Sequence, residues 1–349
     1  MKKAFVLASV MLLGFASYAQ KHWYKVTVVA FYNLENFYDT VDNPIVNDDD
    51  FTPAGEKNYN TTVYMDKVGK LATVLSQIGT DVTPDGPALI GVAEIENDTV
   101  LTDLVNHPLL KNRGYKFVHY DSRDARGVDV AMLYNPKYFT VEQSRKLFVR
   151  LPEGSKGQRY FTRDVLWVKG KLDGETIHVY VNHWPSRIGG EERSAPARAA
   201  AAMVSKHHMD SIEKKEPNHK VIIMGDLNDD PVSPSLTKVL HAKEHADDVQ
   251  PGGLFNPWIE LYKKGIGTLA FQDAWGLFDQ ILLSYPWLTK DQDGYFYYRQ
   301  HIFSKEFMKE NLGRYKGYPM RTWDGNTYRG GYSDHFPTYV VLLKKIPSQ

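Results

Sequence analysis

The feature that most constrains the fold is a series of short apolar runs, each of which adjoins a polar cluster. The runs are rich in β-branched residues and lie at 25–31, 88–93, 176–182, 221–224, 276–283 and 338–343. Runs of this length and composition are typical of buried β-strands. Because binding sites on sheets usually lie at strand ends, the pattern predicts that the polar clusters meet there.

Two segments between these runs predict helices. Apolar residues recur at helical spacing within 64–78, and 195–214 has a helix-forming composition. No internal repeat, low-complexity linker or domain boundary is evident in the sequence. The order of strands and helices therefore predicts one α/β domain over 20–349.

The first 19 residues predict a secretory signal peptide. Lys2 and Lys3 precede an apolar run, and the small residues Ser17 and Ala19 follow it. The run is much shorter than the roughly 20 apolar residues that a membrane span needs. We expect cleavage after Ala19, export to the periplasm or the extracellular space, and no transmembrane segment in the mature chain.

The cysteine count and the charge limit the possible chemistry. The chain has no cysteine, so disulfides cannot stabilise it and a metal must be held by oxygen and nitrogen ligands. Loss of the two leader lysines leaves 40 basic residues against 42 acidic ones, which is a net charge of about −2. The absence of a basic surplus argues mildly against processive binding of long nucleic acids.

Glu94 is the first candidate site residue. It ends the apolar run 88–93, where a buried carboxylate is costly unless it is paired or bound to a metal. A capping or solvated acid at a strand end is the alternative interpretation. Glu96 is the neighbouring acid two residues further on, and Glu94, which ends the run directly, is the preferred candidate.

Three further clusters combine acids, amides and histidines at strand ends. Asp226 and Asn228 can face the same way after 221–224, although an Asx-turn would use the same residues. His335 follows Asp334 and could act as a general acid or base. A lone loop histidine is more often structural, but His183 at another strand end raises the probability of a site.

The motifs together resemble those of the endonuclease/exonuclease/phosphatase superfamily. The motifs FYNLENF, GVAEIEN, NHWPSR, MGDLND, FDQILLS and SDHFP occur in the order of that family, over about 25–345. The resemblance implies two packed, mainly antiparallel β-sheets flanked by helices, a four-layer α/β sandwich of the deoxyribonuclease I type. It also implies a monomeric, metal-dependent phosphoesterase acting on a phosphoester substrate.

The resemblance further implies a role for each matching residue. Glu94 is the metal-binding carboxylate, with Asn33 close to the metal or the phosphate and Asp334 as a further ligand. Oxygen ligands suit Mg²⁺, with Mn²⁺ or Ca²⁺ as substitutes. The catalytic roles fall on six residues. Asp226 orients or deprotonates water, Asn228 donates to a phosphate oxygen, and His335 binds the phosphate. Asp279 or Asp334 holds His335, and His183 lies toward the leaving group.

Some positions depart from the family pattern or have two interpretations. Ala93 stands where the family often carries glutamine. Asp129 is the candidate partner of His183, or else a buried structural acid. Arg163 and Arg187 could bind substrate phosphate, although surface arginines are the more common interpretation.

The sequence leaves the substrate open. Aromatic and cationic residues alternate in 285–329, where they could stack bases, bind a lipid or inositol headgroup, or only pack. We expect an exported nuclease, with nucleic acid as the partner, as the first interpretation. A phosphatase or phosphodiesterase of small phosphoesters, inositol phosphates or phospholipid headgroups is the alternative, and an inactive binding module is the third.

Overall fold

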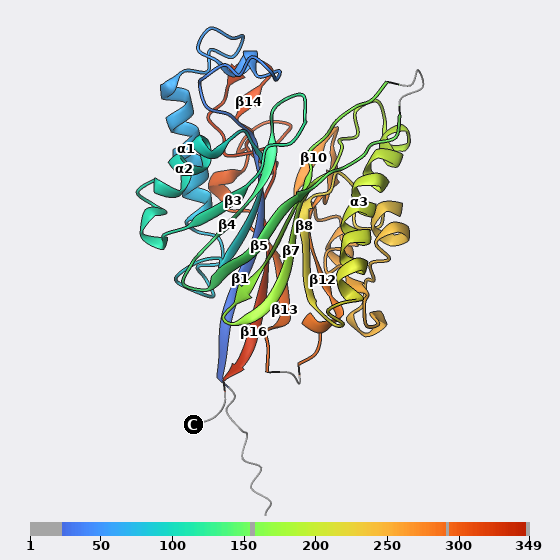
Figure 1. Cartoon of the computed structure of the whole chain (residues 1–349). Helices are drawn as coiled ribbons and strands as arrows, with labels where there is room; N and C mark the ends of the chain where they lie inside the picture. The colour runs from blue at the N-terminus through green and yellow to red at the C-terminus, as the bar shows by residue number, and fades with distance from the viewer. Residues whose placement is uncertain (1–22, 154–157, 291–292, 347–349) are drawn as a thin grey trace, which may run out of the picture.

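The computed structural model describes residues 23–153, 158–290 and 293–346, so the expected signal peptide lies outside the described residues. Two six-stranded β-sheets pack face to face, with helices on their outer faces (Figure 1). Most neighbouring strands are antiparallel, and one pair in each sheet is parallel. This architecture confirms the predicted fold class, with two mixed sheets flanked by few helices.

The first sheet has the order β13-β16-β1-β2-β4-β3. Its strands are β1 (Trp23–Phe37), β2 (Leu89–Ile95), β3 (Lys116–His119), β4 (Asp129–Tyr134), β13 (Phe296–Ile302) and β16 (Thr338–Ile346). β1 pairs antiparallel with β16 on one side and parallel with β2 on the other. Strand β13, which forms one edge, lies in the aromatic segment for which the sequence predicted no strand.

The second sheet has the order β5-β6-β7-β8-β12-β9. Its strands are β5 (Phe139–Leu147), β6 (Val165–Leu172), β7 (Glu175–His183), β8 (Lys220–Asp226), β9 (Leu254–Phe255) and β12 (Asp279–Ser284). Two short ribbons lie outside the sheets: β10 (Leu269–Phe271) with β11 (Ala274–Gly276), and β14 (Trp323–Asp324) with β15 (Thr327–Tyr328).

The inner faces of the two sheets form a core of aliphatic and aromatic side chains. Their close approach is visible at Gly91 of β2, where an added Cβ would lie 2.5 Å from the sulfur of Met224 in β8. Only a residue without a side chain fits there. The contact holds the strand that carries Glu94 against the strand that carries Asp226.

Four α-helices lie among the described residues, and the first three cover the sheets. Helices α1 (Thr61–Leu75) and α2 (Asp98–Asn106) pack on the first sheet, and α3 (Glu191–Glu213) packs on the second (Figure 1). The short α4 spans Ile259–Lys263. Helix α1 starts earlier than predicted because the Asn60 side chain accepts hydrogen bonds from the N–H groups of Thr62 and Val63. None of these helices is long and apolar enough to cross a membrane.

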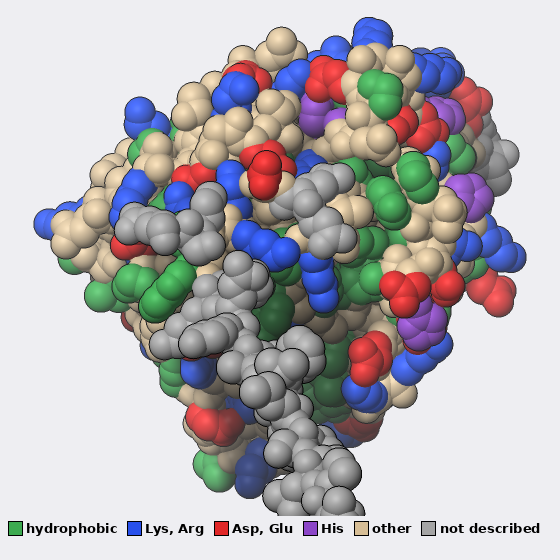
Figure 2. All heavy atoms as spheres, turned by 90° about the horizontal axis from the view of Figure 1, so that it is seen from below, with side chains coloured by type: hydrophobic (Ala, Val, Ile, Leu, Met, Phe, Trp, Pro, Cys, Tyr) green, Lys and Arg blue, Asp and Glu red, His purple; other side chains and the backbone are tan. Residues whose placement is uncertain are grey.

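The chain termini leave the described residues at the end of the sheets away from the polar clusters. Figure 2 shows this end, where basic and acidic side chains are interspersed. The view therefore presents both signs of charge and no single-sign surface.

Candidate active site

The polar clusters meet at one end of the two packed sheets, where strands β1, β2, β7 and β8 end, toward the top of Figure 1. The parallel pairs β1 with β2 and β7 with β8 each bring two carboxyl ends to this edge. Strands β12 and β16 are antiparallel to them and begin there. A hydrogen bond of 2.7 Å from Ser333 Oγ to the carbonyl of Asn33 connects the segment before β16 to β1 at the site.

Asp226 lies at the centre of the site. Its Oδ2 accepts a hydrogen bond of 3.0 Å from Asn33 Nδ2, and its Oδ1 accepts one of 3.0 Å from the Asn228 N–H. The Nε2 atoms of His183 and His335 lie 3.6 and 3.9 Å from Oδ2. Burial raises the pKa of Asp226 to about 6, against the opposing charge of His335. The structure thus brings together five residues that the sequence singled out.

His335 is held by a buried carboxylate. Its Nδ1 donates to Asp279 Oδ2 at 2.7 Å, and the Thr268 hydroxyl donates to the same oxygen. Burial lowers the pKa of His335, but the charge and hydrogen bond of Asp279 outweigh it and raise the pKa well above its ordinary value. Asp334, the other acid considered, lies 3.8 Å from Nε2. The imidazolium can therefore donate to an anion in front of it.

Glu94 reaches the site through a β-bulge. It has φ of +60°, and the registers of β2 with both neighbouring strands shift at this point. Its Oε2 accepts a hydrogen bond of 2.8 Å from the Asn36 N–H, and Arg126 lies 3.7 Å from Oε1. Burial raises the pKa of Glu94, but Arg126 and the Asn36 N–H outweigh it and lower the pKa. Glu96, the neighbouring acid, instead accepts a hydrogen bond of 2.7 Å from the Asp39 N–H.

His183 lies between two carboxylates. Its Nε2 is 3.8 Å from Glu94 Oε1 and 3.6 Å from Asp226 Oδ2. Burial, together with the charge of Arg163, holds the pKa of His183 well below its ordinary value. The imidazole is therefore neutral, in contrast to His335.

Asp129 does not support His183. Its Oδ1 accepts a hydrogen bond of 2.9 Å from the Ser122 N–H, and its Oδ2 lies 3.5 Å from His119 Nε2. The buried Nδ1 of His183 has no hydrogen-bond partner among the described residues. Asp129 thus serves as a buried structural acid, the alternative that the sequence left open.

Arg163 is buried behind the site. It donates to Asp124 Oδ2 at 2.9 Å, to the carbonyl of His183 at 3.2 Å and to the carbonyl of Trp184 at 2.5 Å. The Trp184 carbonyl also accepts from Asn228 Nδ2 at 2.9 Å. These contacts position the end of β7 and the Asn228 amide. The guanidinium faces protein groups rather than the substrate side.

Arg187 is likewise engaged with the protein. Its Nε donates to the carbonyl of Asn228 at 2.9 Å, and its two Nη atoms donate to Glu191 and Asp230. The guanidinium lies over the ring of Phe278 at 4.4 Å. We therefore assign Arg187 to the support of the loop that carries Asn228.

Sequence reasoning missed a buried charge cluster beneath the site. Glu35 Oε2 accepts a hydrogen bond of 2.7 Å from the Thr322 N–H, and Lys67 Nζ donates to the Thr322 hydroxyl at 2.7 Å. Burial and the charge of Asp334 raise the pKa of Glu35 to about 7. A lysine on the apolar face of 64–78 was the signal for this cluster, because a buried lysine needs a partner.

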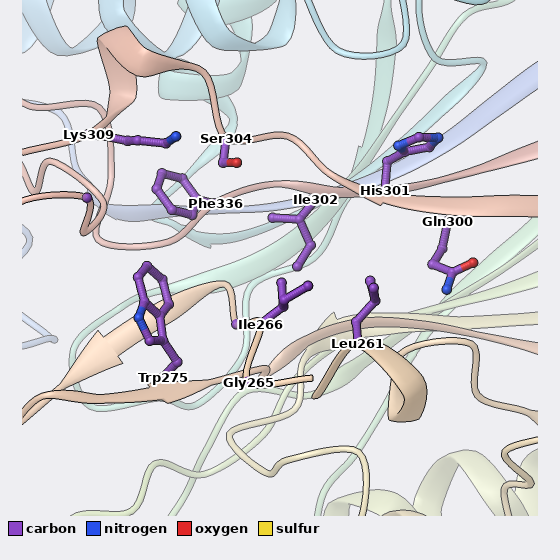
Figure 3. A pocket seen from close by; sticks show the side chains of 12 residues that line it. Leu261, Gly265, Ile266, Trp275, Gln300, His301, Ile302, Ser304, Lys309 and Phe336 are labelled. Atoms are coloured by element: carbon purple, nitrogen blue, oxygen red, sulfur yellow. The ribbon is translucent and has the colours of Figure 1, made fainter. Parts of the chain in front are cut away.

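Two hollows adjoin His335 and its neighbours. One, of about 440 Å³, is lined by Asp334 and by residues of 270–273 and 310–329. The other, of about 460 Å³, lies on the far side of Phe336 and is lined by Trp275, Ile266 and Ile302 (Figure 3). The second hollow contains none of the predicted site residues. The first is the one that opens beside the site.

The packed sheets and the acids, amides and histidines at their edge define a phosphoester hydrolase. The chain belongs to the Endonuclease/Exonuclease/phosphatase family, whose sequence model matches residues 28–344. No curated protein sequence matches the chain.

Solved structures share the fold at low identity. A family protein from Bacteroides thetaiotaomicron is 18% identical with a TM-score of 0.55, covering 93% of this chain and 100% of its own. A mannosyl-6-phosphatase from the same organism is 18% identical with a TM-score of 0.54, covering 90% and 99%. A humanized D. rerio TDP2 is 14% identical with a TM-score of 0.54, covering 91% and 98%.

The site has the donors that a divalent metal of this family requires. Among the described residues Glu94 Oε1 accepts no hydrogen bond, and Arg126 and His183 lie 3.7 and 3.8 Å away, so it can bind a cation. Asp334 carries further oxygens of the kind that hard cations prefer, and so does Asn33, whose Oδ1 also accepts a hydrogen bond of 2.9 Å from the Glu35 N–H. A second group, Asp226, Asp279 and His335, has potential ligand atoms within 4.8 Å of one another. Both carboxylates of this group already accept hydrogen bonds, Asp226 from Asn33 and Asn228 and Asp279 from Thr268 and His335, so we favour the Glu94 side.

Proposed function

We propose that this phosphoesterase depends on a divalent metal, with Mg²⁺ as the expected ion, and uses Asp226 to activate the attacking water. The observation that carries the proposal is the arrangement around Asp226 Oδ2. The neutral His183 and the cationic His335 lie 3.6 and 3.9 Å away from it. Two histidines in different charge states beside one carboxylate suit two tasks, because the cationic one can donate to the phosphate and the neutral one can lie beside the leaving group.

The chain's own residues account for most of the chemistry. Asp226 holds a water and takes its proton as the water oxygen bonds to phosphorus. The His335 imidazolium donates to a non-bridging oxygen, and the Asn228 side-chain amide can donate to another. The ester P–O bond breaks, and the leaving oxygen takes up a proton from solvent water on the His183 side to give the alcohol, while Asp226 releases the proton that it took.

Glu94, Asn33 and Asp334 would hold the metal. When bound, a divalent cation supplies charge neutralisation on the phosphate oxygens. Arg126 and the Asn36 N–H keep Glu94 ionised for this task.

For the substrate, the hollow beside Asp334 favours a compact phosphoester. Its volume of about 440 Å³ is in the range of small-molecule sites. Its arginines are paired with carboxylates, whereas a surface that binds a nucleic-acid backbone needs cations in excess. We therefore place small phosphoesters ahead of the nuclease that the sequence suggested first.

One observation supports a nuclease as the second candidate. The guanidinium of Arg123 lies 5.5 and 5.4 Å from the exposed rings of Phe148 and Phe161. Arg123 precedes Asp124, which binds Arg163 behind His183. Exposed rings beside a cation are a suitable surface on which to stack bases.

The test is hydrolysis of a substrate panel with Mg²⁺ and with excess chelator. The panel contains glucose 6-phosphate, bis-p-nitrophenyl phosphate, plasmid DNA and single-stranded RNA. Asp226→Asn should abolish a chelator-sensitive activity, while Asp247→Asn, at an exposed acid in the turn Ala246–Asp248, should retain it. Full activity of Asp226→Asn, or activity unaffected by chelator, would contradict the mechanism. Cleavage of plasmid DNA or RNA without cleavage of the small esters would favour the nuclease function instead.

The leader over 1–19 supports action outside the cytoplasm. Expression of the full chain followed by N-terminal sequencing tests this proposal. A mature protein that begins at Gln20 in the exported fraction is expected. Retention of Met1 inside the cell would contradict export.

A further inference from the structure

The hollow beside the candidate active site has its own chemistry. It lies between the β10–β11 ribbon and the segment 310–334, which are at the top of Figure 1 near the labels β10 and β14. We call it the Asp334 pocket. Asp334 belongs to both places, because its Oδ1 is 3.8 Å from His335 Nε2 and its Oδ2 is 3.4 Å from Arg321 in the pocket. A group bound in the pocket would therefore lie next to the phosphate.

The charges of the pocket are matched in pairs. Each of its arginines contacts a carboxylate: Arg314 with Asp273, Arg329 with Glu310, and Arg321 with Asp334. Asp324 is a fourth acid, 3.7 Å from Arg329. Three cations against four anions leave no positive charge to attract a second phosphate or a carboxylate.

The same pairs offer closely spaced donors and acceptors. Carboxylate oxygens accept hydrogen bonds and guanidinium N–H groups donate them, and both kinds alternate around the pocket. The Tyr318 hydroxyl donates to Asp273 Oδ1 at 3.2 Å and extends this arrangement. Vicinal hydroxyl groups, which both donate and accept, match such a surface better than an anion does.

Two aromatic rings supply an apolar face. Phe271 at the tip of the β10–β11 ribbon is 70% exposed, and Tyr315 is 56% exposed. The rings of Tyr315 and Tyr318 have centroids 5.7 Å apart. Large exposed rings beside a hollow usually mark a binding surface. The C–H face of a sugar ring can pack on them while its hydroxyls reach the charged pairs.

We propose that the Asp334 pocket binds the alcohol part of the ester and that this part is a neutral sugar. The proposal rests on the phosphoesterase function proposed above and narrows it to sugar phosphates. Phe271 provides the stacking face, and Asp273 with Arg314 provides the hydroxyl contacts. A nucleoside, which is also flat and neutral, is the competing occupant that the experiment must separate.

The first experiment measures binding without catalysis. Glucose, mannose and galactose are titrated into the protein with chelator present, and saturation-transfer NMR detects contact with the sugar ring. Binding of at least one sugar is expected, weakened about tenfold by Phe271→Ala or Asp273→Asn, which is the size of one lost contact. Tyr298→Ala, at a ring of β13 that is 55% exposed, is the matched control and should bind as wild type does. No binding of any of the three sugars, or stronger binding of adenosine, overturns the proposal.

The second experiment compares esters that share one phosphate. Glucose 6-phosphate should exceed ethyl phosphate in kcat/KM by at least about tenfold, and Phe271→Ala should reduce this ratio. Fructose 1,6-bisphosphate should gain nothing from its second phosphate. A preference for the bisphosphate, or for a nucleotide over the sugar phosphate, refutes the sugar pocket while leaving the phosphoesterase intact. Sugar binding without hydrolysis of any ester would refute the phosphoesterase and leave the pocket.

Discussion

Arg163 provides the sharpest test of the site, because the sequence and the structure assign it different roles. The sequence left two interpretations, an arginine that binds substrate phosphate or a surface arginine. In the structure its side chain is 7% exposed and donates to Asp124 and to the carbonyls of His183 and Trp184. Arg163→Met would keep much of the volume and remove all three hydrogen bonds.

The expected cost follows from what the substitution leaves behind. Asp124 becomes a buried carboxylate without its closest cation, and breaking a buried ion pair costs about 3–5 kcal/mol. With an unfolding entropy of about 2.1 cal/mol/K per residue, each kcal/mol corresponds to a Tm change of about 1.4 °C for 349 residues, so Tm should fall by roughly 4–7 °C. Hydrolysis should also fall by about 10²-fold, because the end of β7 that carries His183 loses its anchor.

The assay combines urea unfolding and thermal melts with kcat/KM on bis-p-nitrophenyl phosphate. Arg163→Lys is the matched variant, since it keeps the charge near Asp124 but loses the planar set of donors. It should lie between wild type and Arg163→Met. The double variant Arg163→Met/Asp124→Leu should be more stable than Arg163→Met, because it removes the unpaired charge.

A Tm change of less than about 1 °C in Arg163→Met, within the effect of a surface substitution, together with loss of hydrolysis would contradict a structural role for Arg163. That result would mean that Arg163 contacts the substrate, which is the first of those two interpretations.

Three further predictions concern the metal, the pH and the backbone. Glu94→Gln should remove the Mg²⁺ dependence and lower kcat by about 10²-fold or more, while circular dichroism stays unchanged. Burial lowers the pKa of His178 to about 4, so the unfolded chain binds the proton first and stability falls as pH drops from about 6.5 to about 4. The loss should be about 3 kcal/mol by urea unfolding, and His178→Asn should flatten it. Gly225→Ala would place a Cβ 2.2 Å from the carbonyl of Asn182, and should cost about 1–3 kcal/mol and lower activity. Its control, Gly69→Ala inside α1, has room and should raise stability by about 0.5–1 kcal/mol.

Several local features could be read from the sequence because they depend on neighbours in the chain. The apolar runs before Asp226 and Asp279 form β8 and β12, and helical spacing located α1. The boundaries were less accurate. Strand β1 extends beyond the predicted run 25–31 and continues to Phe37, with positive φ at Glu35 and Asn36. Pairing with β2 keeps the chain in the sheet there, and no local signal encodes that pairing.

Contacts over long sequence distances account for the remaining differences. The bulge at Glu94 depends on its register with β1 and β4. Asp129 pairs with His119 of the adjacent strand, so it cannot reach His183. Arg163 faces Asp124 because the loop before β4 folds over the start of β6. Each outcome depends on which segments become neighbours.

The sequence by itself determined the strand-end pattern, the order of the motifs and the types of side chain available for chemistry, because these follow from local periodicity and composition. Only the tertiary structure decided the charge states and the pocket. His183 is neutral and His335 is cationic because their buried surroundings differ, although both are histidines at strand ends. The Asp334 pocket exists only where 310–334 meets the β10–β11 ribbon. Burial and long-range electrostatics depend on the complete packed fold, and no short window of sequence contains them.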